Sequence, residues 1–278
     1  MREYGFCYVA DSEPYLEEAM RSIASLRAQM PHVPVAVITR RNLFRTDAAV
    51  TDWVELKLDR KGPIVKADAR LAPYERVAFL DTDTMIINDL VRLFALLDRF
   101  DFACAPEPNA RPDHGIDRGI PAAFTEPNSG FFLFRRSPEV LAFFETWLGE
   151  YDLLHDQRGI VNDQPSLRIA LWESPSVRQL TLGSEYNLIP HTNSSVSGAV
   201  AVLHDRSPER FRLANAVNRH IAPRAVVPGF GPVFGYVTRR GWIRQFARLG
   251  WRFLCVLLRP GSVQQQGHPS VWWRDGID

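Results

Sequence analysis

The chain has 278 residues, of which 46% are hydrophobic, and its formal net charge is +1. This size and composition support one large hydrophobic core and exclude a disordered chain, and the near-neutral charge gives no overall field that would attract nucleic acid. Three cysteines, Cys7, Cys104 and Cys255, are far apart and match no metal-binding spacing, so we expect reduced core thiols in a cytoplasmic protein. No apolar run approaches 20 residues and the N-terminus has no long apolar region, so we expect neither a membrane span nor a signal peptide.

In chain order, apolar runs of strand length alternate with segments of helical period. Residues 4–10 predict a strand, after which Ser12 and Pro14 open a helix whose apolar residues recur every three or four positions. Ser137 opens a second helix, and residues 162–172 predict a third. A short helical stretch is expected at 90–97, and further strands are expected at 33–39, 53–58, 77–80, 85–87, 101–105, 130–134, 177–182 and 198–204.

This alternation predicts an α/β fold with a mostly parallel sheet covered by helices on both faces. Ligands in such folds bind at the carboxyl ends of the strands, and three predicted strands end in polar residues: Asp11, the pair Asp81 and Asp83, and His204. Two aspartates at i and i+2 of an extended segment point the same way, so both can face one cation. Carboxylates with one imidazole suit Mn²⁺ or Mg²⁺ better than Zn²⁺.

Each of these residues also has an ordinary structural interpretation. An Asp-x-Asp sequence also occurs in turns and helix caps, and Asp89 before "LVRLF" is typical of such a cap. A single histidine at a strand end is usually a hydrogen-bonding group. The joint placement of Asp81, Asp83 and His204 at strand ends of one α/β chain favours the metal site.

The region "VAFLDTDTMIINDLVRLF" resembles the Asp-x-Asp region of GT-A fold glycosyltransferases, and more narrowly glycosyltransferase family 8, the glycogenin-like and lipopolysaccharide galactosyltransferase-like enzymes. Further matches follow in order over most of the first 210 residues, in "YVADSEPYL", "KADARLAPYERV", "EPNSGFFLF", "NDQPSL", "EYNLIP" and "AVLHD". The resemblance implies a metal held by Asp81, Asp83 and His204, with Asp163 and Gln164 at the anomeric carbon of the donor sugar. It implies nucleotide-sugar contacts from Ala10, Asp11, Lys66, Arg70, Thr82, Asn128, Ser129, Gly130, Tyr186, Asn187 and Arg206.

The chain departs from this family in two places. After the histidine the family continues with a Gly and then Lys-Pro-Trp, whose lysine meets the diphosphate, whereas this chain reads "HDRSPERF". Arg206 or Arg210 could supply that charge. The upstream basic residue is shifted by about one position, so Lys66 and Arg70 compete for that role. Without the resemblance, Asn128 to Gly130 could be only a turn, and Tyr186 only a core aromatic residue.

These residue types suit transfer of a sugar from a nucleoside diphosphate, in which negative charge grows on the leaving diphosphate. The resemblance places Asp11 at the nucleobase, where a carboxylate can accept the ring N–H of uracil, and it thereby implies a UDP-sugar donor; the ligand set predicts Mn²⁺ or Mg²⁺ as cofactor. Gln164 cannot ionise, which favours the retaining transfer usual for this family. The alternative is an inverting enzyme with Asp163 as general base.

Other classes fit less well. A haloacid dehalogenase-like phosphatase also has a strand ending in Asp-x-Asp, but its motif normally follows the first strand, and this chain has no adjacent Asp-Asp pair. A silent sugar-binding protein would be expected to lose the metal ligands. Sugar nucleotidyltransferases are disfavoured because no Gly-rich phosphate loop follows the first strand.

The end of the chain has a different pattern, and we expect a catalytic domain over residues 1–212 and a C-terminal helical extension over 213–278. Arginines recur every fourth residue from Arg240 to Arg252, opposite Trp242, Phe246 and Phe253. A basic face opposite an aromatic face over 239–258 is typical of a helix in a membrane interface, although an ordinary packed helix fits equally well. We therefore expect a cytoplasmic enzyme acting on a glycan or glycolipid acceptor, with attachment to the inner membrane face as one option.

Overall fold

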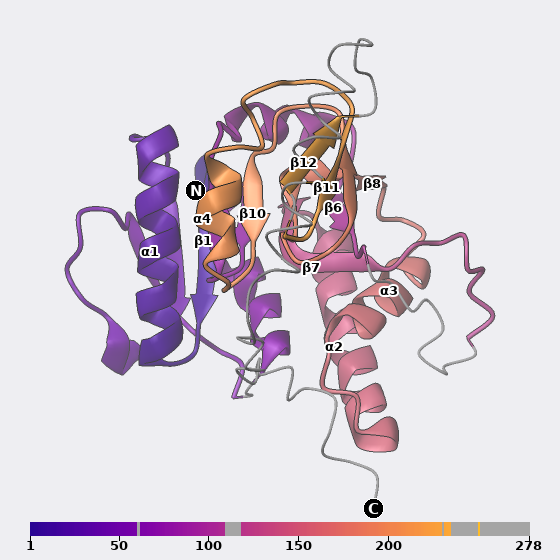
Figure 1. The fold of residues 1–278 in the computed structure, drawn as a ribbon. Helices are drawn as coiled ribbons and strands as arrows, with labels where there is room; N and C mark the ends of the chain where they lie inside the picture. Colours follow the sequence, from indigo (N-terminus) through magenta and orange to yellow (C-terminus); the bar gives the residue numbers. More distant parts are fainter. Residues whose placement is uncertain (60–61, 109–117, 230, 235–249, 251–278) are drawn as a thin grey trace, which may run out of the picture.

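Seven of the predicted strands assemble into one sheet, and the predicted strands at 85–87 and 198–204 form a separate pair. In the computed structural model we describe residues 1–59, 62–108, 118–229, 231–234 and 250 (Figure 1). The strand order is β3-β2-β1-β4-β7-β6-β8. All neighbouring strands run parallel except β7, which is antiparallel to β4 and to β6. The strands are β1 (Arg2–Ala10), β2 (Val35–Thr39), β3 (Asp52–Glu55), β4 (Tyr74–Leu80), β6 (Phe102–Pro106), β7 (Pro127–Arg135) and β8 (Gln179–Thr181).

Helices cover both faces of this sheet, as the alternation of elements predicts. Packed on one face are α1 (Glu13–Gln29) and the 3-10 helix η3 (Val91–Asp98); on the other are α2 (Pro138–Arg158), α3 (Gln164–Trp172) and the 3-10 helix η2 (Pro63–Leu71). The predicted cap of α2 is confirmed, because the side chain of Ser137 accepts a hydrogen bond from the backbone N–H of Val140 at 3.3 Å. The remaining 3-10 helices are η1 (Arg41–Leu43) and η4 (Ser184–Tyr186).

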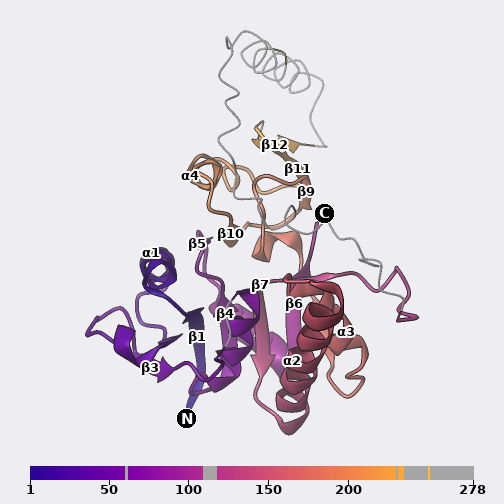
Figure 2. The same cartoon turned by 90° about the horizontal axis from the view of Figure 1, so that it is seen from below.

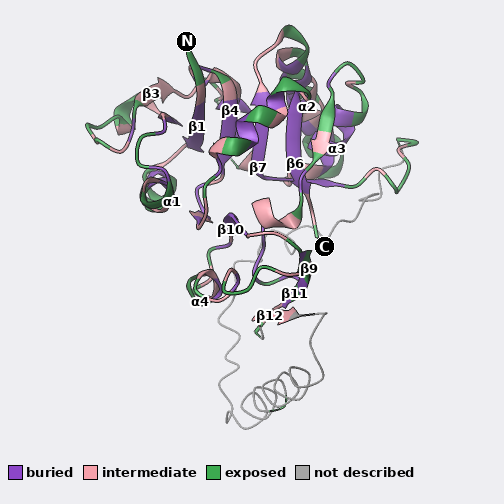
Figure 3. Ribbon diagram, turned by 90° about the horizontal axis from the view of Figure 1, so that it is seen from above, coloured by how far each residue is buried: buried purple, intermediate pink, exposed green. Residues whose placement is uncertain are grey.

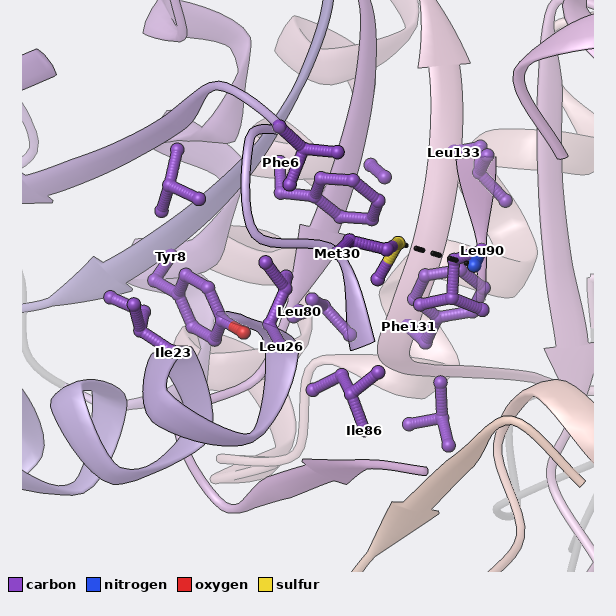
Figure 4. Close-up of a cluster of buried hydrophobic side chains, with 14 of the residues drawn as sticks. Phe6, Tyr8, Ile23, Leu26, Met30, Leu80, Ile86, Leu90, Phe131 and Leu133 are labelled. Atoms are coloured by element: carbon purple, nitrogen blue, oxygen red, sulfur yellow. Dashed lines mark hydrogen bonds between the residues drawn. The ribbon is translucent and has the colours of Figure 1, made fainter. Parts of the chain in front are cut away.

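Strands β6 and β7 are almost entirely buried (Figure 3). Because successive side chains of a strand point to opposite faces, the side chains of these strands alternate between two hydrophobic clusters, one on each face of the sheet. In the cluster under α1, the sulfur of Met30 accepts a hydrogen bond from the backbone N–H of Leu90 at 3.3 Å (Figure 4). In the cluster under α2, Phe132 and Trp147 pack edge to face. Cys7 and Cys104 are buried free thiols, and burial raises the pKa of Cys104 to about 12. Cys255 lies outside the described residues.

Two small sheets lie beyond the carboxyl end of β4. Strands β5 (Thr84–Ile86) and β10 (Val202–His204) pair antiparallel and lie between the large sheet and the sheet of β9 (Ser194–Val196), β11 (Arg224–Val227) and β12 (Gly231–Phe234) (Figures 2 and 3). A third hydrophobic cluster joins residues from 188 to 226 here.

The predicted domain boundary at residue 212 falls inside α4 (Glu209–Ala214). The described residues after it pack with residues before it, since β11 pairs with β9. The division into two domains stays a prediction, and the predicted helix over 239–258 lies outside the described residues apart from Gly250. Among the described helices, none is both long and apolar enough to cross a bilayer.

Candidate metal and nucleotide-sugar site

The two aspartates that follow β4 lie in a turn. Asp81 Oδ1 accepts the backbone N–H of Thr82 at 3.0 Å, and the backbone carbonyl of Asp81 accepts the N–H of Thr84 at 3.2 Å. The extended conformation that we expected for the pair is therefore wrong. The turn still brings both carboxylates to one side, because each lies within 4.0 Å of the same nitrogen of His204.

His204 reaches these carboxylates through the pairing of β10 with β5, which places it opposite Thr84. Its Nε2 lies 3.0 Å from Asp83 Oδ1 and 4.0 Å from Asp81 Oδ2. One potential ligand atom from each of the three residues lies within 4.8 Å of the others. The sequence prediction that these three side chains converge is confirmed.

The donor atoms of this cluster fit a divalent cation. The nearest partner of the buried Asp83 Oδ1 is His204 Nε2 at 3.0 Å, and the same nitrogen lies 4.0 Å from Asp81 Oδ2. A cation can be held by all three of these atoms at once, because each offers a lone pair when the imidazole is neutral. Two carboxylates and one imidazole suit Mn²⁺ or Mg²⁺, whose ligands are mostly oxygens. The identity of the ion is not determined by this set.

Gly130 on β7 makes room for the imidazole. A Cβ atom at this position would lie 2.0 Å from Cε1 and 2.2 Å from Nδ1 of His204, so the ring packs directly on the Gly130 backbone. The carbonyl of Gly130 also accepts the backbone N–H of Asp81 at 2.8 Å. Gly130 therefore brings the backbone of β7 into direct contact with His204, because no side chain fits between that backbone and the imidazole ring.

Lys66 and Arg70, which compete in sequence, point to different places. Lys66 on η2 donates from Nζ to Asp81 Oδ2 at 2.9 Å and to Ser129 Oγ at 3.1 Å. Arg70 lies one turn further and pairs with Glu145 on α2. Of these two basic residues, only Lys66 contacts the cluster of Asp81, Asp83 and His204.

The charges of the cluster shift the pKa of its members in opposite directions. Burial lowers the pKa of His204, but the carboxylates of Asp83 and Asp81 outweigh it and raise that pKa above its usual value. Burial raises the pKa of Asp83, but His204 and Arg206 outweigh it and hold the pKa well below its usual range. Burial likewise lowers the pKa of Lys66, and Asp163 and Asp81 more than offset that effect. These pKa shifts favour the ionised form of Asp83 and the charged forms of His204 and Lys66.

Beside the cluster, a network of amides surrounds one carboxylate that the sequence analysis did not single out. Glu107 Oε2 accepts hydrogen bonds from Asn128 Nδ2 at 2.6 Å and from Gln164 Nε2 at 2.9 Å. Asn128 Oδ1 in turn accepts Asn187 Nδ2 at 2.6 Å and the backbone N–H of Gly130 at 2.8 Å. The structure thus joins Asn128, Gln164 and Asn187, all expected site residues, through Glu107.

Glu107 was missed although a usable signal existed. It follows β6 directly, and β6 runs parallel to β4 because each is antiparallel to β7. Its carboxylate therefore lies at the same edge of the sheet as Asp81. Asn128 reaches that edge for the opposite reason, because it stands at the start of the antiparallel strand β7. We applied the strand-end rule to Asp11, Asp81 and His204 but not to "DFACAPE".

The remaining expected site residues lie as follows. Asp163, at the start of α3, is buried, and its Oδ2 lies 3.8 Å from Lys66 Nζ without a hydrogen-bond partner among the described residues. Ala10 is the last residue of β1, which pairs with β4 in the sheet, and Asp11 follows it directly. The backbone carbonyl of Asp11 accepts a hydrogen bond from Arg40 Nε at 2.9 Å. Tyr186 ends η4 and packs against the cluster under α1.

Arg206 and Arg210, the two arginines after His204, approach Asp83 differently. Arg206 Nη1 lies 3.1 Å from Asp83 Oδ2 and its side chain is 56% exposed. Arg210 Nη1 donates to the backbone carbonyls of Asp83, at 2.9 Å, and of Asp205. Arg210 therefore supports the backbone, whereas Arg206 offers an accessible charge at the cluster.

Solved structures similar to this one are glycosyltransferases. The galactosyltransferase LgtC, in complex with donor and acceptor sugar analogues, matches with a TM-score of 0.51 and 14% identity over 87% of this chain and 99% of that chain. A structure of an LgtC active-site mutant matches with a TM-score of 0.50 and 15% identity, over the same shares of both chains. The glycosyltransferase GlyE of Streptococcus pneumoniae TIGR4 matches with a TM-score of 0.51 and 14% identity, over 75% of this chain and 56% of that chain.

No protein-family model matches the sequence, and no curated protein matches it significantly. At identities of 14% and 15%, the likeness to solved structures is a likeness of fold. The mostly parallel seven-stranded sheet and the helices on both of its faces agree with the fold that the sequence predicted. The chain therefore has the GT-A fold of the glycosyltransferases that it resembles.

Proposed function

We propose that the protein is a metal-dependent glycosyltransferase that moves a sugar from a nucleoside diphosphate sugar to a glycan or glycolipid acceptor. The observation that carries this proposal is the convergence of Asp81, Asp83 and His204 within 4.8 Å, at the carboxyl end of β4 in a GT-A fold. The similar structures are glycosyltransferases, which favours this activity over the phosphatase alternative. A silent binding protein would not need the retained ligand set.

The residues of the cluster suit departure of a diphosphate. A divalent ion held by Asp81, Asp83 and His204 supplies charge that stabilises the leaving diphosphate. Lys66 Nζ, fixed by Asp81 and Ser129, adds a second positive charge on the same side. Arg206 stands at the exposed side of Asp83 and provides the charge that the family takes from a lysine. All three contributions act on the phosphate side of the breaking bond.

The amide network suits the sugar side. Gln164 donates to Glu107, so its amide oxygen is directed away from that carboxylate and can accept from a sugar hydroxyl. Gln164 cannot act as a base, which supports transfer with retention of the anomeric configuration. The inverting alternative rests on Asp163, whose Oδ2 is buried without a hydrogen-bond partner among the described residues. NMR of the product decides between them, since an inverted anomeric coupling constant would make Asp163 the general base.

The nucleotide is proposed to be UDP. Asp11 stands at the end of β1, where its carboxylate can accept the ring N–H of uracil, and Ala10 precedes it. A thermal-shift screen of UDP, GDP and CMP, each with and without Mn²⁺, tests this assignment. We expect stabilisation by UDP that requires the metal. Stabilisation by GDP or CMP alone would overturn the donor assignment.

The metal ligands are tested with two variants and one control. Asp83→Asn and His204→Ala should abolish Mn²⁺-dependent UDP binding while the protein stays folded, because both residues follow strands and lie outside the hydrophobic clusters. Asp89→Asn is the matched control, since Asp89 accepts the backbone N–H of Val91 through Oδ1, which asparagine retains. UDP affinity in excess Mn²⁺ that is equal in Asp83→Asn and wild type would refute the proposed site.

Residues after about Arg239 are proposed to serve acceptor or membrane engagement, with the arginine stripe within 239–258 as the supporting sequence feature. Truncation before Arg239 should leave Mn²⁺-dependent hydrolysis of the donor intact and remove binding to anionic vesicles. If the truncated protein unfolds, or the full chain does not bind such vesicles at low salt, the segment is structural.

A further inference from the structure

A carboxylate on α1 lies next to the cluster of Asp81, Asp83 and His204, through its contacts with Thr82 and Arg206. Glu18 lies outside every sequence motif of the predicted site, and its side chain is 12% exposed. Its Oε2 accepts the hydroxyl of Thr82, the residue between the two aspartates, at 2.6 Å. The same carboxylate accepts Nε and Nη2 of Arg206, each at 3.0 Å. Glu18 thus joins the aspartate turn to the chain that follows His204.

The contact between Glu18 and Arg206 is bidentate, which fixes the plane of the guanidinium group. A guanidinium presents its N–H groups in a rigid fork that matches the two oxygens of a carboxylate. With Nε and Nη2 held by Glu18, only Nη1 remains, and it lies 3.1 Å from Asp83 Oδ2. The ring of Tyr15, one helical turn before Glu18, lies 5.9 Å from the guanidinium carbon. Arg206 therefore has one supported orientation, directed at the metal cluster.

We propose that Glu18 is a positioning residue for donor binding, which holds Arg206 so that Nη1, paired here with Asp83, is directed at the place where the donor diphosphate binds. This inference rests on the proposed glycosyltransferase function. An exposed arginine without such a partner populates many rotamers, and ordering it on binding weakens the affinity for the nucleotide. Glu18 already holds the guanidinium of Arg206 in one orientation in the folded protein, so nucleotide binding does not have to order it. The hydrogen bond from Thr82 to Glu18 also fixes the position of the aspartate turn relative to Arg206.

The test is a double-mutant cycle with UDP as the probe. We expect Glu18→Gln to weaken UDP binding in saturating Mn²⁺ by about tenfold, the scale of one charge-assisted hydrogen bond. Arg206→Met should weaken it at least as much, and Glu18→Gln should add nothing in the Arg206→Met background, because a positioning residue acts through its partner. Glu17→Gln, the adjacent exposed glutamate, is the matched control and should bind UDP as wild type does.

Two further measurements separate positioning from a general structural role. Mn²⁺ affinity without nucleotide, measured by electron paramagnetic resonance of the free ion, should change less than threefold in Glu18→Gln, since Glu18 is not a metal ligand. Arg206→Lys keeps the charge but loses the fork, so its UDP binding should be weakened and insensitive to Glu18→Gln. If Glu18→Gln fails to fold, Glu18→Asp, which keeps the charge but shortens the reach to Arg206, replaces it in the same cycle with the same expected direction.

The outcomes are distinct. Wild-type affinity in folded Glu18→Gln, or a full tenfold loss in the Arg206→Met background as well, would overturn the positioning role and leave the proposed function standing. Wild-type protein that binds none of UDP, GDP and CMP in Mn²⁺ would instead refute the proposed function.

Discussion

Replacing Gly130 by alanine tests how the sheet and the metal cluster depend on each other. The added Cβ would stand 2.0 Å from Cε1 and 2.2 Å from Nδ1 of His204. The alternative to moving the ring is moving β7, which is buried and hydrogen-bonded on both edges, so the ring is expected to move. The change therefore acts on a metal ligand without altering its chemistry.

The size of the displacement follows from the contact distances. Ordinary van der Waals contact begins near 3.4 Å, so Cε1 has to move by about 1.4 Å from its position at 2.0 Å. Metal–ligand distances tolerate only about 0.2 Å, so the displaced imidazole can no longer bind with the two carboxylates. We expect Mn²⁺ affinity to fall by about 10- to 100-fold, the loss typical when a metal ligand loses its orientation. Overpacking should cost about 1–3 kcal/mol of unfolding free energy.

Mn²⁺ affinity by electron paramagnetic resonance and unfolding free energy by urea denaturation measure both effects. Gly149→Ala is the matched control, because Gly149 lies exposed in α2 with nothing within 4 Å of its added Cβ. That substitution should leave Mn²⁺ affinity unchanged and stabilise the helix by about 0.5–1 kcal/mol. The double variant Gly130→Ala with His204→Ala should bind Mn²⁺ as weakly as His204→Ala alone.

Two results would refute this reasoning. Gly130→Ala with wild-type Mn²⁺ affinity would mean that His204 does not bind the ion from this position. A loss of stability in the double variant as large as in Gly130→Ala alone would mean that the Cβ disturbs the strand and not the ring.

Three further predictions follow from other contacts. Lys66→Met should weaken Mn²⁺-dependent UDP binding by at least tenfold, whereas Arg70→Met should change it less than twofold, because only Lys66 contacts the cluster; equal titration-calorimetry affinities for the two variants would contradict this. Arg178 and Arg135 hold the pKa of Asp101 below its usual range, although burial opposes them. A depressed carboxyl pKa stabilises the fold above the unfolded pKa of about 4 and loses that effect as the pH falls, so Asp101→Asn should flatten the loss of stability below pH 4 in urea titrations. Removal of divalent ions by a chelator should lower the melting temperature of the protein with UDP more than that of the protein without nucleotide, because the ion and the diphosphate stabilise each other's binding; an equal drop in both would show that UDP binding does not depend on the ion.

The sequence by itself located most strands and helices of the large sheet and singled out Asp81, Asp83 and His204 as candidate metal ligands. Hydrophobic runs and caps located the strands and helices because local periodicity and capping depend on neighbouring residues only. The strand-end rule singled out Asp81, Asp83 and His204, whose side chains converge in the structure. The same rule, applied to the strand before Glu107, would have found that carboxylate as well.

Only the tertiary structure decided which polar residues meet. The reversed direction of β7 brings Asn128 to the site edge, and this direction depends on pairing with strands distant in sequence. Lys66 and Arg70 lie one 3-10 turn apart on η2, and only packing of η2 against α2 directs Arg70 to Glu145. The contact of Gly130 with His204 joins residues 74 positions apart, and Glu18 meets Arg206 across 188. Such contacts depend on the order and direction of the strands in the sheet. The packing of residues far apart in the sequence determines that order and direction, so no local sequence pattern predicts the contacts.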